Sequence, residues 1–96
     1  MANQNFNSDF IVSPDAVVSF NDDGIVVLHR GNGSLYKSNG TGARIWRLVE
    51  QRLRLEAIAE EISSHYQIVR DTAREHTARF LDELERNALI RREVAS

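Results

Sequence analysis

The sequence predicts an α+β domain in which three antiparallel strands come first and three helices follow. Two observations lead to this class. First, all five glycines and the single proline lie in residues 1–43. Second, residues 1–43 carry only two basic and four acidic residues, whereas residues 44–96 carry ten arginines and ten acidic residues. Turns between short strands favour glycine, and amphipathic helices carry charge on their solvent side. At 96 residues, the chain has the length of one small domain.

Three short runs of β-prone residues predict the strands. They are residues 17–20, 25–30 and 34–38, and the turns between them are Asp22-Asp23-Gly24 and Gly31-Asn32-Gly33. Glycine and asparagine tolerate the positive φ that tight hairpin turns need. Two tight turns in succession make a meander, so we expect the first and third strands to lie at the two edges of the sheet.

Three runs with apolar residues at helical spacing predict the helices. The first begins after the candidate caps Asn39 and Thr41, the second runs from Leu55 to about Tyr66, and the third begins near Asp71. The third helix is expected to carry two neighbouring apolar lines, a main inward line of Ala73, Thr77, Phe80 and Leu84 and a second line of Ala78, Leu81 and Ala88. The last two helices have the spacing of a helix-turn-helix motif.

The two ends of the chain are expected to lie outside the folded domain. We predict a flexible N-terminal arm over residues 1–12, the folded domain over 13–92 and a frayed C-terminus over 93–96. The N-terminus has no features of a secretory signal, and the longest apolar run, Ile25–Leu28, is far too short to span a membrane. Together with the absence of cysteine, these features predict a cytoplasmic protein.

The residue types that commonly act in catalytic sites do not occur in patterns that predict an enzyme. The histidines His29, His65 and His76 lie on different predicted elements and lack the spacing of metal ligands. The acidic residues of the helical half alternate with arginines at helical spacing, which is typical of a solvated, ion-paired face. No serine-containing nucleophile elbow is present, and the absence of cysteine excludes a cysteine nucleophile. We therefore expect no catalytic residue, no cofactor and no metal.

One ordered set of segments is distinctive. It comprises Gly24-Ile25-Val26-Val27-Leu28, Gly33-Ser34-Leu35-Tyr36, Asn39-Gly40-Thr41-Gly42-Ala43-Arg44-Ile45-Trp46, Ile58-Ala59-Glu60-Glu61-Ile62, His65-Tyr66, Phe80-Leu81-Asp82-Glu83-Leu84 and Leu89-Ile90. These segments resemble the family of coenzyme pyrroloquinoline-quinone (PQQ) synthesis protein D, over roughly residues 13–92. The strand-to-helix join that ends in Trp46 is the most specific of them.

The resemblance implies a fold and a function. Members of that family are small domains similar to winged helix-turn-helix proteins, and they act as peptide chaperones. They bind the leader segment of a ribosomally made precursor peptide and present it to a modifying enzyme, often a radical-SAM enzyme or a leader peptidase. Founding members serve the PQQ pathway, and many relatives serve lasso-peptide and other modified-peptide pathways. Both kinds of pathway stay open here.

Strand addition gives the implied function a physical basis. An edge strand leaves N–H and C=O groups unpaired, and an extended peptide can pair with them. The third strand would provide this edge, and its groove with the third helix would hold the specificity-giving side chains. The expected peptide-binding residues are Ser34, Leu35, Tyr36, Lys37 and Ser38 from the strand and Arg74, Ala78 and Leu81 from the helix. Lys37 and Arg74 would bind leader carboxylates.

Two other functions stay open at this point. Arginine provides 11 of the 12 basic residues, which together with the helix-turn-helix spacing fits a winged helix-turn-helix DNA-binding protein. Residues 70–87, however, carry four arginines and five acidic residues, and this net charge of −1 is unfavourable beside DNA phosphates. The other function is a protein–protein adaptor without peptide specificity. We expect no nucleic-acid or membrane partner, and a second copy of the chain is an alternative occupant of the edge, as a homodimer.

Overall fold

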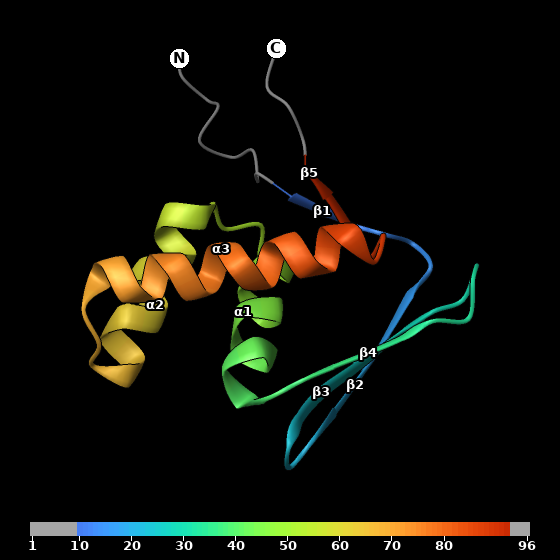
Figure 1. Cartoon of the computed structure of the whole chain (residues 1–96), viewed down its shortest axis with the longest axis horizontal. Helices are drawn as coiled ribbons and strands as arrows, with labels where there is room; N and C mark the ends of the chain where they lie inside the picture. Colours follow the sequence, from blue (N-terminus) through green and yellow to red (C-terminus); the bar gives the residue numbers. More distant parts are fainter. Residues whose placement is uncertain (1–9, 93–96) are drawn as a thin grey trace.

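The computed structural model of the protein describes residues 10–92 and is shown in Figure 1. Its elements are β1 (Phe10–Val12), β2 (Ala16–Asn21), β3 (Gly24–His29), β4 (Leu35–Ser38), α1 (Gly40–Glu50), α2 (Leu55–Tyr66), α3 (Arg70–Arg86) and β5 (Ile90–Arg92). The predicted α+β class, with a three-stranded antiparallel sheet before three helices, is confirmed. Within this part of the chain, no helix has the length and apolar composition that crossing a membrane requires.

The predicted meander forms a sheet with the strand order β2-β3-β4. In both connections an asparagine side chain accepts hydrogen bonds from the turn backbone. The Oδ1 atom of Asn21 accepts hydrogen bonds from the N–H groups of Asp23 and Gly24, at 2.8 and 2.9 Å. In the second turn, the Oδ1 atom of Asn32 accepts one from the N–H of Ser34 at 2.9 Å. β2 and β4 are therefore the two edges of this sheet, as expected.

A second, smaller sheet joins the two ends of the described chain. Phe10–Val12, which we expected at the end of a flexible arm, forms β1 and pairs antiparallel with β5, so that Phe10 stands opposite Arg92 and Val12 opposite Ile90. Phe10 and Ile90 are buried in the core. The rest of the predicted arm, residues 1–9, and the predicted frayed end, residues 93–96, lie outside the described residues.

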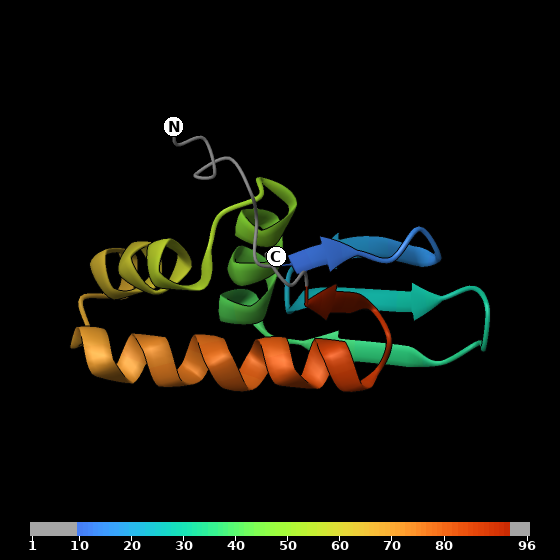
Figure 2. The same cartoon turned by 90° about the horizontal axis from the view of Figure 1, so that it is seen from above.

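The core fills the space between one face of the meander and the helices. Ile25 and Val27 of β3 point into it, and Trp46 of α1 is its largest fully buried side chain. The main inward line predicted for α3 is confirmed, because its four residues Ala73, Thr77, Phe80 and Leu84 are buried. α1 packs against β3 and β4, the C-terminal half of α3 runs alongside β4, and α2 lies beyond α1, where it packs against α3 (Figure 2).

The start of α1 is fixed by its cap and by a close approach. Of the two candidate caps, Asn39 is the one used, since its side chain accepts a hydrogen bond from the N–H of Gly42 at 3.0 Å. Gly42 is buried where α1, β4 and α3 meet. A Cβ atom on Gly42 would collide with the Oγ of Ser38 and would lie 2.7 Å from the Cβ of Ser38 and 2.9 Å from Cε1 of Phe80. This position therefore holds the strand and the two helices at their observed separation.

We expect Gly42→Ala to lower the free energy of unfolding by about 1–3 kcal/mol, because the added methyl group has to displace β4 or α3. Thermal denaturation followed by circular dichroism measures this change. Gly40→Ala is the matched control, since a Cβ atom at Gly40 meets no atom within 4 Å. A Gly42→Ala variant as stable as Gly40→Ala would contradict the close packing described here.

Candidate functional site

β4 has one open edge, and the hairpin hydrogen bonds show which backbone groups point there. The N–H of His29 donates to the carbonyl oxygen of Ser34 at 2.9 Å. In an antiparallel pair the direction alternates from residue to residue. Tyr36 and the other even-numbered residues therefore turn their N–H and C=O groups toward β3, while Leu35 and Lys37 turn theirs away. No strand of residues 10–92 pairs with this side of β4, so the N–H and C=O groups of two residues lie along an open edge.

The side chains of β4 alternate between the two faces of the sheet. Tyr36 stands opposite the buried residue Val27, so Tyr36 and Ser38 face the core side. Leu35 and Lys37 consequently face the outer side, and Leu35 is 62% exposed. A peptide that adds to this edge would pair with the backbone of Leu35 and Lys37, and its side chains on the core side would lie next to those of Tyr36 and Ser38.

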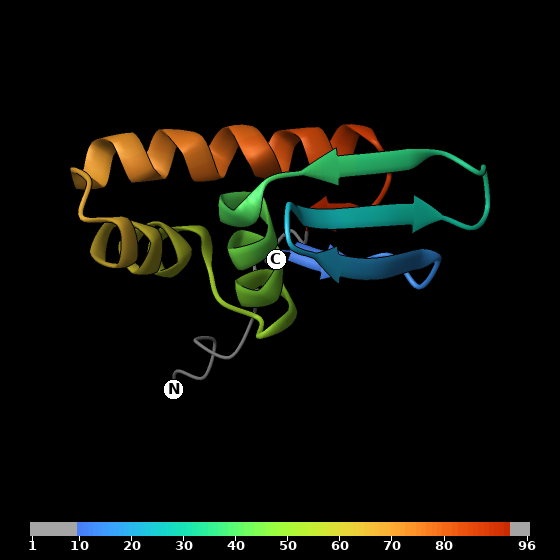
Figure 3. The same cartoon turned by 90° about the horizontal axis from the view of Figure 1, so that it is seen from below.

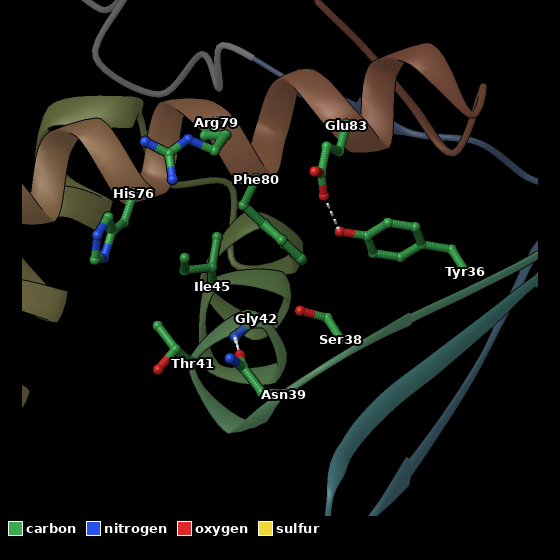
Figure 4. Close-up of a pocket in the computed structure, with 10 residues that line it drawn as sticks. All are labelled: Tyr36, Ser38, Asn39, Thr41, Gly42, Ile45, His76, Arg79, Phe80 and Glu83. Atoms are coloured by element: carbon green, nitrogen blue, oxygen red, sulfur yellow. Dashed lines mark hydrogen bonds between the residues drawn. The ribbon is translucent and has the colours of Figure 1, made fainter.

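A cavity of about 320 Å³ lies on the core side of this edge, between β4, the start of α1 and α3 (Figure 4). Ile45 and Phe80 give it an apolar part, and His76 and Arg79 of α3 add cationic or polar groups. Its lining residues are Tyr36, Ser38, Asn39, Thr41, Gly42, Ile45, His76, Arg79, Phe80 and Glu83. The cavity can therefore receive side chains of an extended peptide that is paired with β4.

Tyr36 connects the strand to the helix across this cavity. Its hydroxyl donates a hydrogen bond to Oε1 of Glu83 at 2.7 Å, and its ring packs at a tilted angle against Phe80, with the ring centroids 5.9 Å apart. Burial, followed by the hydrogen bond to Glu83 and its negative charge, raises the pKa of Tyr36 above its ordinary value. The hydroxyl therefore stays protonated and serves as the donor in this pair.

We expect Tyr36→Phe to lower the free energy of unfolding by about 0.5–1.5 kcal/mol, the net contribution of one hydrogen bond. Because the pKa of Tyr36 is raised in the folded state, this contribution is fully present below the unfolded-state pKa of about 10 and is lost as the pH rises above it. Thermal unfolding at pH 7 and at alkaline pH measures both effects. Tyr66→Phe, on an exposed ring that contacts His65, is the matched control. Equal loss in both variants would contradict the role of the Tyr36–Glu83 bond.

The strand residues predicted for peptide binding are neighbours in the structure, but only some of their side chains reach the cavity. Leu35, Tyr36, Lys37 and Ser38 form β4. Ser34 lies in the turn before it, where its N–H and hydroxyl both bind the side chain of Asn32. Only Tyr36 and Ser38 of this set line the cavity with their side chains.

The three helix residues predicted for the groove do not line it. The guanidinium of Arg74 donates to a carboxylate oxygen of Glu56 on α2 at 2.6 Å. Leu81 is 1% exposed and belongs to the core. Ala78 is half-buried and lines, together with Arg74, a different hollow of α3. The geometry therefore does not bring these three side chains to the edge of β4.

The side of α3 that faces β4 carries His76, Arg79, Phe80 and Glu83 instead. These residues have the spacing i, i+3, i+4 and i+7, so they form one helical line that shares Phe80 with the buried line. The sequence signal for this line was weak because three of its four members are polar. The apolar line of Ala78 and Leu81 was the stronger pattern, and it lies on a side of the helix that does not line the cavity.

The described residues offer no metal site, since no group of three or more histidine, cysteine, aspartate or glutamate side chains is placed to hold an ion. Glu83, the carboxylate that lines the cavity, is engaged by Tyr36. What the arrangement provides is an open backbone edge beside a cavity with apolar and cationic walls.

The family model of coenzyme PQQ synthesis protein D (PqqD) matches residues 24–90. The chain belongs to this family. The matched segment runs from the start of β3 to the start of β5, and it includes both β4 and α3. The resemblance stated from the sequence is thus confirmed. No match was found among curated proteins.

Two solved structures share the fold of this PqqD-family chain. The structure described as "TbiB1 in Complex with the TbiA(beta) Leader Peptide" is 30% identical, with a TM-score of 0.79, and the match covers 88% of this chain and 98% of that one. The structure described as "Lasso peptide synthetase B1 complexed with the leader peptide" is 24% identical, with a TM-score of 0.78 and coverage of 86% and 98%. At 24% identity, the second structure shows a similarity of fold alone.

Proposed function

We propose that this PqqD-family chain binds the leader segment of a ribosomally made precursor peptide by strand addition to β4 and presents it to a modifying enzyme. The observation that carries the proposal is the open edge of β4, where the backbone groups of Leu35 and Lys37 lie beside a cavity. Strand addition uses such an edge for affinity and pockets beside it for specificity. Family membership supports the proposal, as does the similar fold of TbiB1, which is described in complex with a leader peptide.

The cavity has to contribute to affinity because the edge alone is not sufficient. Four backbone hydrogen bonds contribute about 2–6 kcal/mol, at about 0.5–1.5 kcal/mol each. Micromolar affinity corresponds to about 8 kcal/mol. One buried aliphatic side chain adds about 1.5–3 kcal/mol, so a leader needs at least one such anchor. Ile45 and Phe80 provide the apolar walls against which it would pack.

The charged side chains indicate how a leader carboxylate would be bound. Arg74 is paired with Glu56, and the side chain of Lys37 faces the outer side of the sheet. Arg79 lines the cavity and has only a long contact of 3.7 Å with Glu75. We therefore assign carboxylate binding to Arg79, with His76 beside it, in place of the two residues expected from the sequence.

The chain would act as a binding module without a catalytic step of its own. The chemistry would belong to the partner enzyme, for which a radical-SAM enzyme and a leader peptidase are the two candidate classes. The chain has to release the leader after modification, so its affinity for the leader should be moderate. Reversible strand addition allows such an affinity.

The proposal is tested by titrating the protein into the fluorescein-labelled leader of a candidate precursor peptide from a neighbouring open reading frame, with fluorescence anisotropy as the readout. We expect a Kd of about 1 μM or lower, and at least about tenfold weaker binding of a leader with the same composition in scrambled order. A short DNA duplex titrated at low and high salt tests the DNA-binding alternative. Equal binding of both peptides, or binding of the duplex alone, would contradict leader recognition.

A further inference from the structure

The face of the meander that points away from the core carries an apolar row. The strand register places Val17 of β2 beside Leu28 of β3, and Leu28 beside Leu35 of β4. Val17 is 44% exposed and Leu35 is 62% exposed. Figure 3 views the sheet from this side, and no helix or strand of residues 10–92 lies over it. Apolar side chains gathered on one exposed face, rather than scattered singly, are typical of an interaction surface.

The three strands contribute one charged side chain to this face. The strands β2, β3 and β4 contain no aspartate or glutamate, and Lys37 is their one lysine or arginine. Lys37 stands opposite Val26, in the row next to the apolar one. A partner that covers the apolar row also reduces the hydration of this ammonium group, so a carboxylate on the partner is favoured there over a second cation.

The outer face is continuous with the edge at which the leader would bind. A strand added beside β4 would place alternate side chains next to those of Leu35 and Lys37, on the same face. The face would therefore be wider in the leader-bound protein than in the free protein. A partner that contacts both parts of it would distinguish the two states.

We propose that this outer face, formed by Val17, Val26, Leu28, Leu35 and Lys37, is the docking surface for the modifying enzyme. The enzyme would cover it with a segment that carries apolar side chains and at least one carboxylate. This inference rests on the proposed leader-binding function. It assigns the side chains of Leu35 and Lys37 to the enzyme, while their backbone groups pair with the leader, and it makes the leader-bound form the preferred partner of the enzyme.

Substitutions at Val17 change the outer face without changing the edge that would bind the leader, because β2 lies at the opposite edge of the sheet from β4. Val17→Glu and Val17→Lys place opposite charges at one position. Leader binding is measured by anisotropy, and binding of a purified candidate modifying enzyme from a neighbouring open reading frame is measured by biolayer interferometry with saturating leader. We expect both variants to keep the leader Kd within about twofold, Val17→Glu to weaken enzyme binding at least about tenfold, and Val17→Lys at most about threefold.

Ala57→Glu, on the exposed side of α2, is the matched control and should leave enzyme binding unchanged. If Val17→Glu does not fold, Val17→Ser removes only the apolar contact and should weaken enzyme binding about threefold or more. Wild-type enzyme binding by Val17→Glu, or equal losses in the glutamate and lysine variants, would overturn the inference. A wild-type protein that does not bind the leader would instead overturn the proposed function.

Discussion

Lys37→Pro is expected to weaken leader binding at least about thirtyfold while the protein stays folded. Proline at this position removes an N–H group that points to the open edge, and its ring occupies the place of the guest strand. The hydrogen bonds between β3 and β4 are unaffected because the backbone groups of Lys37 point away from β3, and edge strands tolerate proline on the solvent side. Anisotropy titration with the labelled leader measures the effect, and circular dichroism verifies the fold.

Lys37→Ala is the matched control because it removes the side chain but keeps the N–H group. Since that side chain faces the outer side of the sheet, we expect the alanine variant to bind the leader within about threefold of the wild type. Equal affinities of the proline and alanine variants would show that β4 is not the strand to which the leader adds. Tyr36→Pro is unsuitable for this purpose, since it would break a hydrogen bond to β3.

Trp46→Ala is expected to lower the free energy of unfolding by about 3–5 kcal/mol, the usual cost of removing a buried aromatic side chain. Domains of this size are stable by only about 5–15 kcal/mol, so a large part of the population would unfold on mild heating. Trp46 is fully buried among the helices and the sheet. Urea denaturation followed by far-UV circular dichroism is the suitable measurement, because the substitution removes the only tryptophan.

The indole nitrogen of Trp46 provides the control for this prediction. It is buried and has no hydrogen-bond partner among the described residues. Trp46→Phe removes this unsatisfied group and keeps an aromatic ring, so it should cost less than half as much as Trp46→Ala. A loss below about 1 kcal/mol for Trp46→Ala would mean that Trp46 is not the centre of the core.

Features that depend on neighbouring residues could be predicted from the sequence. The two turns of the meander follow from glycine and asparagine at fixed positions, and Asn39 caps α1 from within its own turn. The edge position of β4 follows from the meander itself, since a strand joined to β3 by a tight turn leaves its other side open. These contacts are short in sequence, so local residue types determine them.

Features that depend on distant parts of the chain could not be predicted in this way. β1 and β5 are three residues each, and they are recognisable as strands only because they pair with each other. The side of α3 that faces β4 depends on the path of the chain through α1 and α2, and the polar line of His76, Arg79 and Glu83 shows no amphipathic signal of its own. The helix residues predicted for the site lie away from the cavity for this reason, and their part in peptide binding stays a prediction.

The pairing of β1 with β5 has a practical consequence for protein engineering. Phe10 and Arg92 stand opposite each other, so the first and last described residues lie at neighbouring positions. Both positions lie on the small ladder and not on β4, which is part of the other sheet. Residues 10–92 can therefore be inserted into a host protein through short linkers, or circularly permuted, and the open edge of β4 stays accessible.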